Sequence, residues 1–484
     1  MMRRQGILIL SLILTVVCVS LPSGLATAQN RVEVADGGAL GKAVQQARPG
    51  DVITIAPGRH SLRRITIRAA GTPNAPIHVR AVVPGSVVLD VASTTGFKVA
   101  APYWVFENLE VRGRCNKHGN CEHAFHIVGA ASGTVIRGNV LRDFNAPIKG
   151  NGEKGKSGRV FPNDVLIEGN AFFNDSVRET RNPVSGFDVV GGKRWTIRGN
   201  FFADFAKSSG SQVGYAGFLK GNSSNGVYER NLVICEWRHV GGIRVGLSFG
   251  GGGTSNTAIC DGGDCSRNHS AGVMRNNVIA NCAGDVGIYV NKSSDIGIYN
   301  NLLFNTYGID VRFPVSTADV QNNIIAGGIR DRDGGRSLAA VNIVAGRSYA
   351  ATLPAAARYV KRRLTGQDKK YPNYVDAEDV AWAKGLVDSM LNWSGNTWLG
   401  HGSNAIRALY ADADSLDLRL SAPDDVIDQG VVLPDVVDDF CGHPRKLPPH
   451  DLGPIEYGAG VCDVREMPAY QAALAAIERD VARR

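Results

Sequence analysis

The sequence has only one long hydrophobic run, and it lies at the start of the chain. Arg3 and Arg4 precede an apolar stretch over residues 6–19, and residues 26–28 (Ala-Thr-Ala) supply the small side chains of a cleavage site. This order of charged, apolar and small residues is typical of a secretory signal peptide. No later segment is long and apolar enough to cross a bilayer. We therefore predict a signal peptide over residues 1–28, no membrane span, and a mature chain that is periplasmic or secreted.

Motifs for nucleic acid are also lacking, and the basic residues are spread along the chain. The glycine run at residues 250–253 is not a phosphate loop, because no Gly-Lys-Ser/Thr follows a strand there. The formal net charge is +8, and removal of the two signal-peptide arginines leaves +6. A basic exported chain without such motifs favours an acidic partner other than nucleic acid. The sequence gives no prediction of oligomeric state.

Helical periodicity is absent from most of the chain, and a different repeat takes its place. Asparagine precedes a short apolar run at intervals of 31, 31, 30 and 31 residues and then of 46, 24 and 22. These asparagines are Asn108, Asn139, Asn170, Asn200, Asn231, Asn277, Asn301 and Asn323. A fixed period of this size indicates a solenoid, and runs of Val, Ile and Phe between Gly, Asn and Ser favour strands. We predict an all-β fold, a single-stranded right-handed parallel β-helix over residues 29–345.

Three segments depart from the strand pattern. Residues 39–47 have the pattern of an amphipathic helix, and we expect this helix to cover the open edge of the first coil. We predict a helical insertion over residues 346–395. Residues 396–464 are assigned to the final coils and a closing segment. Residues 465–484 are assigned to a C-terminal helix or tail that either packs on the solenoid or lies free.

Eight cysteines remain after the signal peptide is removed, and an even number in an oxidising compartment indicates disulfides. Two close pairs are each suited to closing a loop, a third to closing the C-terminal segment, and two cysteines remain for a fourth pair. The predicted pairs are Cys115/Cys121, Cys260/Cys265, Cys441/Cys462 and Cys235/Cys282.

A second strand precedes each asparagine run. Apolar and polar residues alternate along it, and because side chains alternate between the two faces of a strand, the polar residues point outward. One residue per coil then forms an outward column: His126, Lys149, Asp188, Lys220, Arg244, Tyr289 and Asp310. We expect this column to be the functional face of the solenoid.

The N-terminal part of this pattern resembles the parallel β-helix polysaccharide lyases, particularly the alginate lyase and chondroitinase B family. The resemblance covers the architecture over most of residues 30–345. The segments that carry it are Ala39-Leu40-Gly41-Lys42-Ala43, Arg48-Pro49-Gly50-Asp51-Val52-Ile53, Gly71-Thr72-Pro73 and Pro76-Ile77, with Asp451-Leu452-Gly453-Pro454-Ile455-Glu456 as a closing motif of many exported β-helix proteins.

In that family a lysine base and an arginine lie on neighbouring coils, and the resemblance implies these positions for Lys220 and Arg244. The family also has a calcium site formed by acidic residues shortly before the lysine. This chain has Ser-Gln-Val-Gly at residues 211–214, with no carboxylate. We therefore predict no metal site and no certain cofactor, and calcium stays open.

The expected activity is a β-elimination that cleaves a uronate-containing polysaccharide. Lys220 would remove the C5 proton if its pKa is lowered, Arg244 would pair with the substrate carboxylate, and Tyr289 would protonate the leaving oxygen. The remaining predicted substrate-binding residues are His126, Lys149, Asp188, Asn291, Asp310 and Arg312. The structural alternative is that Lys220 only pairs with Asp188.

Other functions remain open or are disfavoured. A non-catalytic glycan-binding or export-scaffold protein is the main alternative. A C5-epimerase removes the same proton, but the Asp-Pro-His-Asp motif of mannuronan epimerases is absent. A hydrolase needs two carboxylates about 5–9.5 Å apart, whereas Asp188 and Asp310 are expected four coils apart, about 19 Å. Asp285 is a substitute that is equally suited to a turn. Arg178 is expected to be a solvated charge.

Overall fold

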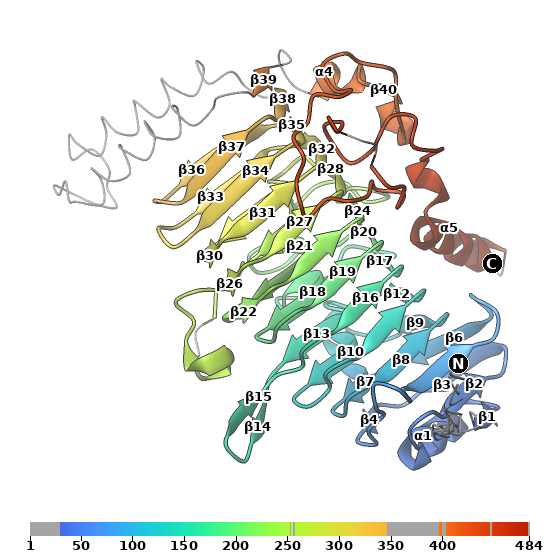
Figure 1. Ribbon diagram of the computed structural model, residues 1–484. Helices are drawn as coiled ribbons and strands as arrows, with labels where there is room; N and C mark the ends of the chain where they lie inside the picture. Colours follow the sequence, from blue (N-terminus) through green and yellow to red (C-terminus); the bar gives the residue numbers. More distant parts are fainter. Residues whose placement is uncertain are drawn as a thin grey trace, which may run out of the picture.

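The computed structural model describes residues 30–251, 253–254, 257–345, 396–398, 403–445 and 448–482. The predicted signal peptide and the predicted helical insertion lie outside the described residues. Three long parallel sheets run the length of the molecule, and each coil contributes one strand to each sheet (Figure 1). The predicted parallel β-helix is therefore confirmed. No helix in the described part is long and apolar enough to cross a membrane.

The strands of each sheet follow one another in chain order along the axis of the solenoid. Sheet A contains β1 (Arg31–Val34), β2 (Val52–Ile55), β5 (Ile77–Ala81), β8 (Trp104–Glu107), β11 (Val135–Arg137), β16 (Leu166–Glu168), β19 (Thr196–Arg198), β23 (Val227–Glu229), β27 (Val273–Arg275), β31 (Ile296–Tyr299), β34 (Thr317–Gln321) and β37 (Arg336–Ala340). Sheet B contains β3 (Gly58–Leu62), β6 (Val87–Val91), β9 (Glu110–Gly113), β12 (Val140–Arg142), β17 (Ala171–Phe173), β20 (Phe201–Ala203), β24 (Leu232–Ile234), β28 (Val278–Cys282), β32 (Leu302–Thr306), β35 (Ile324–Ala326), β38 (Ile343–Ala345) and β39 (Thr397–Trp398). Sheet C contains β4 (Ile65–Ile67), β7 (Thr95–Val99), β10 (His123–Val128), β13 (Ile148–Asn151), β18 (Val184–Val190), β21 (Val213–Lys220), β25 (Ile243–Phe249), β29 (Ile288–Asn291), β33 (Gly308–Arg312) and β36 (Gly328–Arg332).

Smaller elements decorate the three sheets. The hairpin β14 (Glu153–Gly155) and β15 (Gly158–Val160) leaves the end of β13, and a short ladder joins β22 (Ser223–Ser224), β26 (His269–Ser270) and β30 (Ser293–Ser294). The C-terminal segment contains α4 (Ser403–Arg407), β40 (Tyr410–Asp412), β41 (Asp417–Leu420) and α5 (Pro468–Val481). At the other end α1 (Gly37–Gln46) packs against the first strands and buries Leu40 and Val44, as expected for a capping helix.

The repeated asparagines form a buried ladder inside the solenoid. Each side-chain Nδ2 donates to the Oδ1 of the next asparagine at 2.9–3.1 Å, and that Oδ1 also accepts the preceding backbone N–H. The ladder runs through Asn139, Asn170, Asn200, Asn231, Asn277, Asn301, Asn323, Asn342 and Asn396. Every turn at this corner thus satisfies its buried polar groups.

The start of the predicted series is wrong by one residue. The register places Leu109, not Asn108, at the ladder position, because Glu110 pairs with Val140 and the Leu109 N–H donates to Asn139 Oδ1 at 3.0 Å. Asn108 lies one residue earlier in a left-handed turn, with φ of 63°. Single-residue spacing in the sequence does not separate these two positions.

The C-terminal segment covers the outer face of sheet B, where it forms a second apolar layer with strands β12 to β38. Helix α5 lies on this face, on the side of the solenoid away from the β14–β15 hairpin (Figure 1). Tyr470 of α5 packs edge-on to Phe201 with ring centroids 5.1 Å apart. The C-terminal helix therefore packs on the solenoid and does not lie free.

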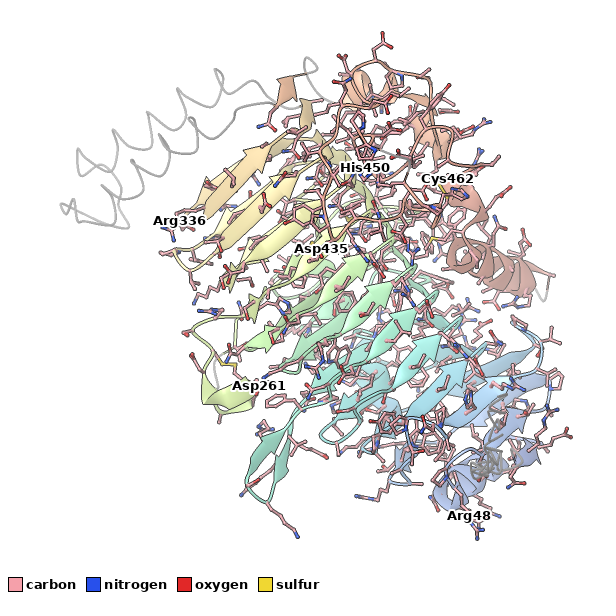
Figure 2. The ribbon with its side chains drawn as sticks, viewed as in Figure 1. Arg48, Asp261, Arg336, Asp435, His450 and Cys462 are labelled. Carbon is pink, nitrogen blue, oxygen red and sulfur yellow. A yellow bond between two sulfur atoms is a disulfide. The ribbon has the colours of Figure 1, made fainter. Side chains whose placement is uncertain are left out.

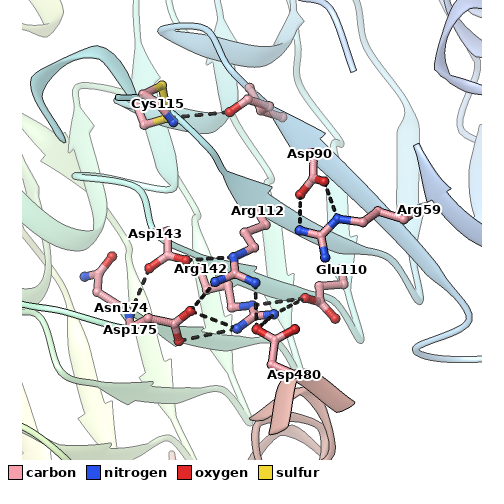
Figure 3. Close-up of polar contacts among 12 residues, drawn as sticks. Arg59, Asp90, Glu110, Arg112, Cys115, Arg142, Asp143, Asn174, Asp175 and Asp480 are labelled. Atoms are coloured by element: carbon pink, nitrogen blue, oxygen red, sulfur yellow. Dashed lines mark hydrogen bonds and ion pairs between the residues drawn. A yellow bond between two sulfur atoms is a disulfide. The ribbon is translucent and has the colours of Figure 1, made fainter. Parts of the chain in front are cut away.

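Charged side chains fix the end of α5 to sheet B (Figure 3). Arg142, which is 1% exposed, bonds Glu110 at 2.7 Å, Asp480 at 2.9 Å and Asp175 at 3.0 Å. Arg112 also bonds Asp480, at 2.6 Å. A buried network of this kind is costly to break from one side. All four predicted disulfides are present as well: Cys115–Cys121, Cys235–Cys282, Cys260–Cys265 and Cys441–Cys462.

Candidate functional site

Polar side chains form a row across the outer face of sheet C on four successive coils. Lys98 pairs in register with His126, His126 with Lys149, and Lys149 with Asp188. The apolar residues beside them on the same strands belong to the solenoid core, so the row faces outward. The predicted alignment of His126, Lys149 and Asp188 is confirmed, and the roles of these residues stay predictions.

Asp188 is the acidic centre of this row. Its Oδ2 accepts the Lys149 ammonium at 2.7 Å, and its Oδ1 is buried with no hydrogen-bond partner among the described residues. Burial opposes ionisation of Asp188, but the positive charges of Lys149 and Lys220 outweigh it and hold the pKa of the carboxyl below its usual value. Asp188 is therefore ionised at neutral pH and orients Lys149.

Lys220 lies one coil beyond Asp188 and two residues further along the strand, because it pairs with Val190. Its side chain is mostly buried, with 8% of the residue exposed, and its ammonium lies over the Phe218 ring at 4.7 Å. Among the described residues Lys220 forms no ion pair. Burial lowers its pKa, Asp188 opposes this change, and Lys149 adds to it. The predicted pairing of Lys220 with Asp188 is replaced by the Lys149–Asp188 pair.

Two histidines adjoin the lysines and have defined tautomers. His123 Nδ1 lies 2.8 Å from the Ala146 carbonyl, which accepts from it, so its Nε2 is left as an acceptor. His126 Nε2 lies 2.6 Å from Asn151 Oδ1, so its Nδ1 is left as an acceptor. Burial lowers the pKa of His123 to about 4, and burial with Lys149 and Lys98 lowers that of His126. Both rings are neutral acceptors for substrate hydroxyl groups.

Two projections on one side of the solenoid border this face (Figure 1). Glu153 of the β14–β15 hairpin pairs with Lys98, and Arg159 Nε of the same hairpin donates to the Ala258 carbonyl at 3.0 Å. Ala258 lies in the disulfide loop of residues 257–267, which also contains Asp261 (Figure 2). The Asp261 N–H donates to the Gly221 carbonyl at 2.9 Å, directly after Lys220. The hairpin and the disulfide loop thus form one wall beside the two lysines.

The predicted position of Arg244 beside Lys220 is wrong. Arg244 pairs in register with Gly214, six residues before Lys220 on β21, and is 1% exposed. Its guanidinium donates to the carbonyls of Gly241 and Cys235. Strands β21 and β25 are longer than the earlier strands of sheet C, so the apolar-polar pattern at their starts belongs to a different part of the coil. Arg244 is turned away from the outward row.

Tyr289 and Asp310 continue the outward row, but buried residues separate them from the lysines. Phe218 and Ser248 occupy the intervening coils and are 2% and 0% exposed. Tyr289 lies two coils beyond the coil of Lys220, about 10 Å along the axis. The proton donor and the base of the expected mechanism therefore lie apart.

The later coils hold their own group of paired charges. Asn291 Nδ2 donates to the Tyr289 hydroxyl at 2.7 Å, and Arg312 pairs with Asp333 at 2.5 Å. Asp310 accepts Arg330 at 2.5 Å and also accepts Arg332. Asp310 is four coils from Asp188, as expected, which keeps these two carboxylates too far apart for glycoside hydrolysis.

Sequence reasoning missed two residues of the site. Lys98 lies in the same apolar-polar alternation as His126, one coil earlier, but it precedes the regular asparagine series. His123 was considered only as a structural or zinc-binding residue. Cys115 and Cys121, which completed the zinc pattern, form a disulfide, and the described residues contain no group of three or more His, Cys, Asp or Glu arranged to hold a metal ion.

Comparison with known proteins finds similarity in fold alone. No family model matches the chain, and no curated protein matches its sequence. A pectate lyase crystal structure is 14% identical over 89% of this chain and 97% of its own, with a TM-score of 0.47. A PL6 family polysaccharide lyase from Pseudopedobacter saltans is 13% identical over 87% and 99%, with a TM-score of 0.43. An alginate lyase from Paenibacillus is 14% identical over 65% and 99%, with a TM-score of 0.35.

Proposed function

We propose that this protein is an exported polysaccharide lyase that binds a uronate-containing polymer on the outer face of sheet C. Four disulfides suit a protein of an oxidising compartment. The observation that carries the proposal is the arrangement of Lys149, Asp188 and Lys220 on adjacent coils. It combines an oriented cation, a fixed carboxylate and a buried amine with a lowered pKa.

In the proposed reaction Lys149 neutralises the carboxylate of the sugar whose C5 proton is removed. That contact stabilises the negative charge that develops as the proton leaves. The neutral amine of Lys220 takes the C5 proton, the C4–O4 bond breaks, and a double bond forms between C4 and C5. The resulting Lys220 ammonium then returns the proton to the O4 of the departing chain. A single group thus serves as base and acid, and Tyr289 is not needed for this step.

Asp188 and the histidines have supporting roles in this scheme. Asp188 holds Lys149 in place through the 2.7 Å contact and takes no proton itself. The free acceptors of His123 and His126 accept sugar hydroxyl groups. Because neither ring is charged at neutral pH, neither competes with Lys149 for the carboxylate.

The test is incubation of the mature protein with alginate, glucuronan, pectate and chondroitin, followed by ultraviolet absorbance of unsaturated uronate. We expect new absorbance with at least one polymer. Lys220→Ala is expected to abolish turnover and largely retain binding, because the ammonium contributes little to affinity once it is neutral. Lys42→Ala on exposed α1 is the matched control and is expected to retain activity.

The remaining candidate functions give different results in the same assay. Binding without new absorbance for every polymer would contradict the lyase and support a glycan-binding scaffold. Exchange of the C5 hydrogen with deuterium from solvent, without chain cleavage, would support a C5-epimerase. Full activity in Lys220→Ala would show that Lys220 is not the base.

A further inference from the structure

A second hollow lies at the corner between sheets B and C, away from the outward row. It is a pocket of about 380 Å³ beside the Cys115–Cys121 disulfide. One side is lined by Arg114, His118 and Arg178, and the other by Arg112, Asp143 and Asp175. The proposed lyase reaction uses none of these residues.

Arg178 is a buried cation in this lining, contrary to the expected solvated charge. It is 3% exposed, and its guanidinium donates to Asn145 Oδ1 at 3.1 Å and to the His118 carbonyl at 3.2 Å. It forms no ion pair with any carboxylate in the described part of the chain. Burial lowers the pKa of Arg178, as expected for a charge without a direct counterion. A buried charge of this kind is costly unless an anion pairs with it.

Two further donors lie on the same side of the pocket. Arg114 is exposed and forms no ion pair with another described residue. His118 Nδ1 accepts the Glu179 N–H at 2.8 Å, so the neutral ring carries its proton on Nε2. Burial, followed by the field of Arg178, lowers the pKa of His118 and keeps the ring neutral. This side therefore offers N–H donors and unpaired positive charge.

The carboxylates on the other side are already occupied (Figure 3). Asp143 accepts Arg112 Nε at 3.0 Å and the Asp175 N–H at 2.9 Å. Asp175 accepts Arg112 at 2.6 Å and Arg142 at 3.0 Å. Because these acids are bound to Arg112 and Arg142, they do not neutralise Arg114 and Arg178 by direct contact.

We propose that this pocket binds the carboxylate of an acidic sugar, with Arg114 and Arg178 as its ligands. The pocket size suits a monosaccharide unit, and guanidinium groups bind carboxylates through paired hydrogen bonds. The inference rests on the proposed function in one respect, the assignment of the ligand as a uronate of the same polymer. Asn145 links the two sites, because it accepts from Arg178 and donates to Glu122, the residue before His123.

The test measures binding by calorimetry in the Lys220→Ala variant, so that no substrate is consumed. The probes are a uronate oligosaccharide, glucuronate, glucose and inorganic sulfate. We expect Arg114→Ala to weaken oligosaccharide and glucuronate binding by at least about tenfold, the effect of one charged hydrogen bond. Arg31→Ala on β1, also exposed, is the matched control and is expected to leave binding unchanged. Arg178→Lys tests the buried ligand after its fold is checked by circular dichroism.

Three outcomes would overturn the proposal. They are unchanged affinity in Arg114→Ala, equal affinity for glucose and glucuronate, and sulfate binding without glucuronate binding. The result is independent of the lyase test: a chain that binds glucuronate through Arg114 but yields no unsaturated product contradicts only the proposed activity. A chain that yields product with normal binding in Arg114→Ala contradicts only the pocket.

Discussion

Lys220 depends on its surroundings for the chemistry proposed here. An exposed lysine is protonated at neutral pH and cannot remove a proton. Burial beside Phe218 and the nearby charge of Lys149 both favour the neutral amine, whereas Asp188 favours the ammonium. The balance between Lys149 and Asp188 therefore sets how much of Lys220 is in the reactive form.

The pH dependence of activity tests this balance. Activity should rise with pH as Lys220 loses its proton, with a midpoint below the ordinary lysine value of 10.5. Lys149→Ala removes a positive neighbour, which raises the pKa of Lys220 and shifts the rise to higher pH by about one unit. Asp188→Asn removes the opposing negative charge and should shift the rise to lower pH.

The measurement is kcat/KM against pH for the native protein and the two variants, with loss of rate recorded separately. Shifts in the same direction for both variants would contradict the assignment, because the two neighbours carry opposite charge. A profile that does not change in either variant would show that another group sets the rise.

Within the coils, the asparagine ladder is the element that fixes one corner of the solenoid. Each amide bridges two coils and accepts a backbone N–H that has no other partner. The ladder also crosses the interruptions in the repeat: Asn231 bonds Asn277 across 46 residues, and Asn342 bonds Asn396 across 54. The ladder thus keeps coil register where long loops leave the solenoid.

Removal of one rung should be strongly destabilising. Asn200→Ala leaves the Asn170 N–H and the Ile167 carbonyl without their partners in a fully buried site. We expect a loss of about 2–4 kcal/mol in the free energy of unfolding, from two unsatisfied buried groups. Chemical denaturation measures it, with Asn74→Ala in an exposed turn as the control. A loss below about 0.5 kcal/mol, typical of a surface substitution, would show that the ladder is not stabilising.

The contact between α5 and sheet B makes a second prediction at this scale. Arg142→Ala leaves Glu110 buried, with only Arg479 of α5 as a cationic partner, at 2.9 Å. We expect a loss of about 3–5 kcal/mol, as for other broken buried ion pairs. We also expect faster proteolysis and amide exchange in residues 468–481. Arg419→Ala in the exposed C-terminal segment is the control. Unchanged exchange in α5 would contradict a holding role for Arg142.

For the whole molecule, the fold was predictable because its signal repeats. Equal spacing of Asn139, Asn170, Asn200 and Asn231 reflects a constraint that every coil shares, so errors at single positions do not change the conclusion. The disulfides were predictable for a simpler reason, since two pairs are close in sequence and few partners remain for the others.

The site was predicted only in part because it depends on register between coils. His126, Lys149 and Asp188 lie on strands of regular spacing and were placed correctly. Lys220 and Arg244 lie on the longer strands β21 and β25, where the loop before β25 shifts the pairing by several residues. A shift of this size leaves the alternation of apolar and polar residues unchanged, so the sequence contains no sign of it.

The central claim is that the sugar which loses its proton lies on sheet C between Lys149 and Lys220. A crystal structure of the Lys220→Ala variant with a bound uronate oligosaccharide tests it most directly. The account predicts a sugar carboxylate in contact with the Lys149 ammonium and the C5 hydrogen directed at position 220. An oligosaccharide bound only on sheet A or sheet B, with no sugar in contact with Lys149, would contradict it.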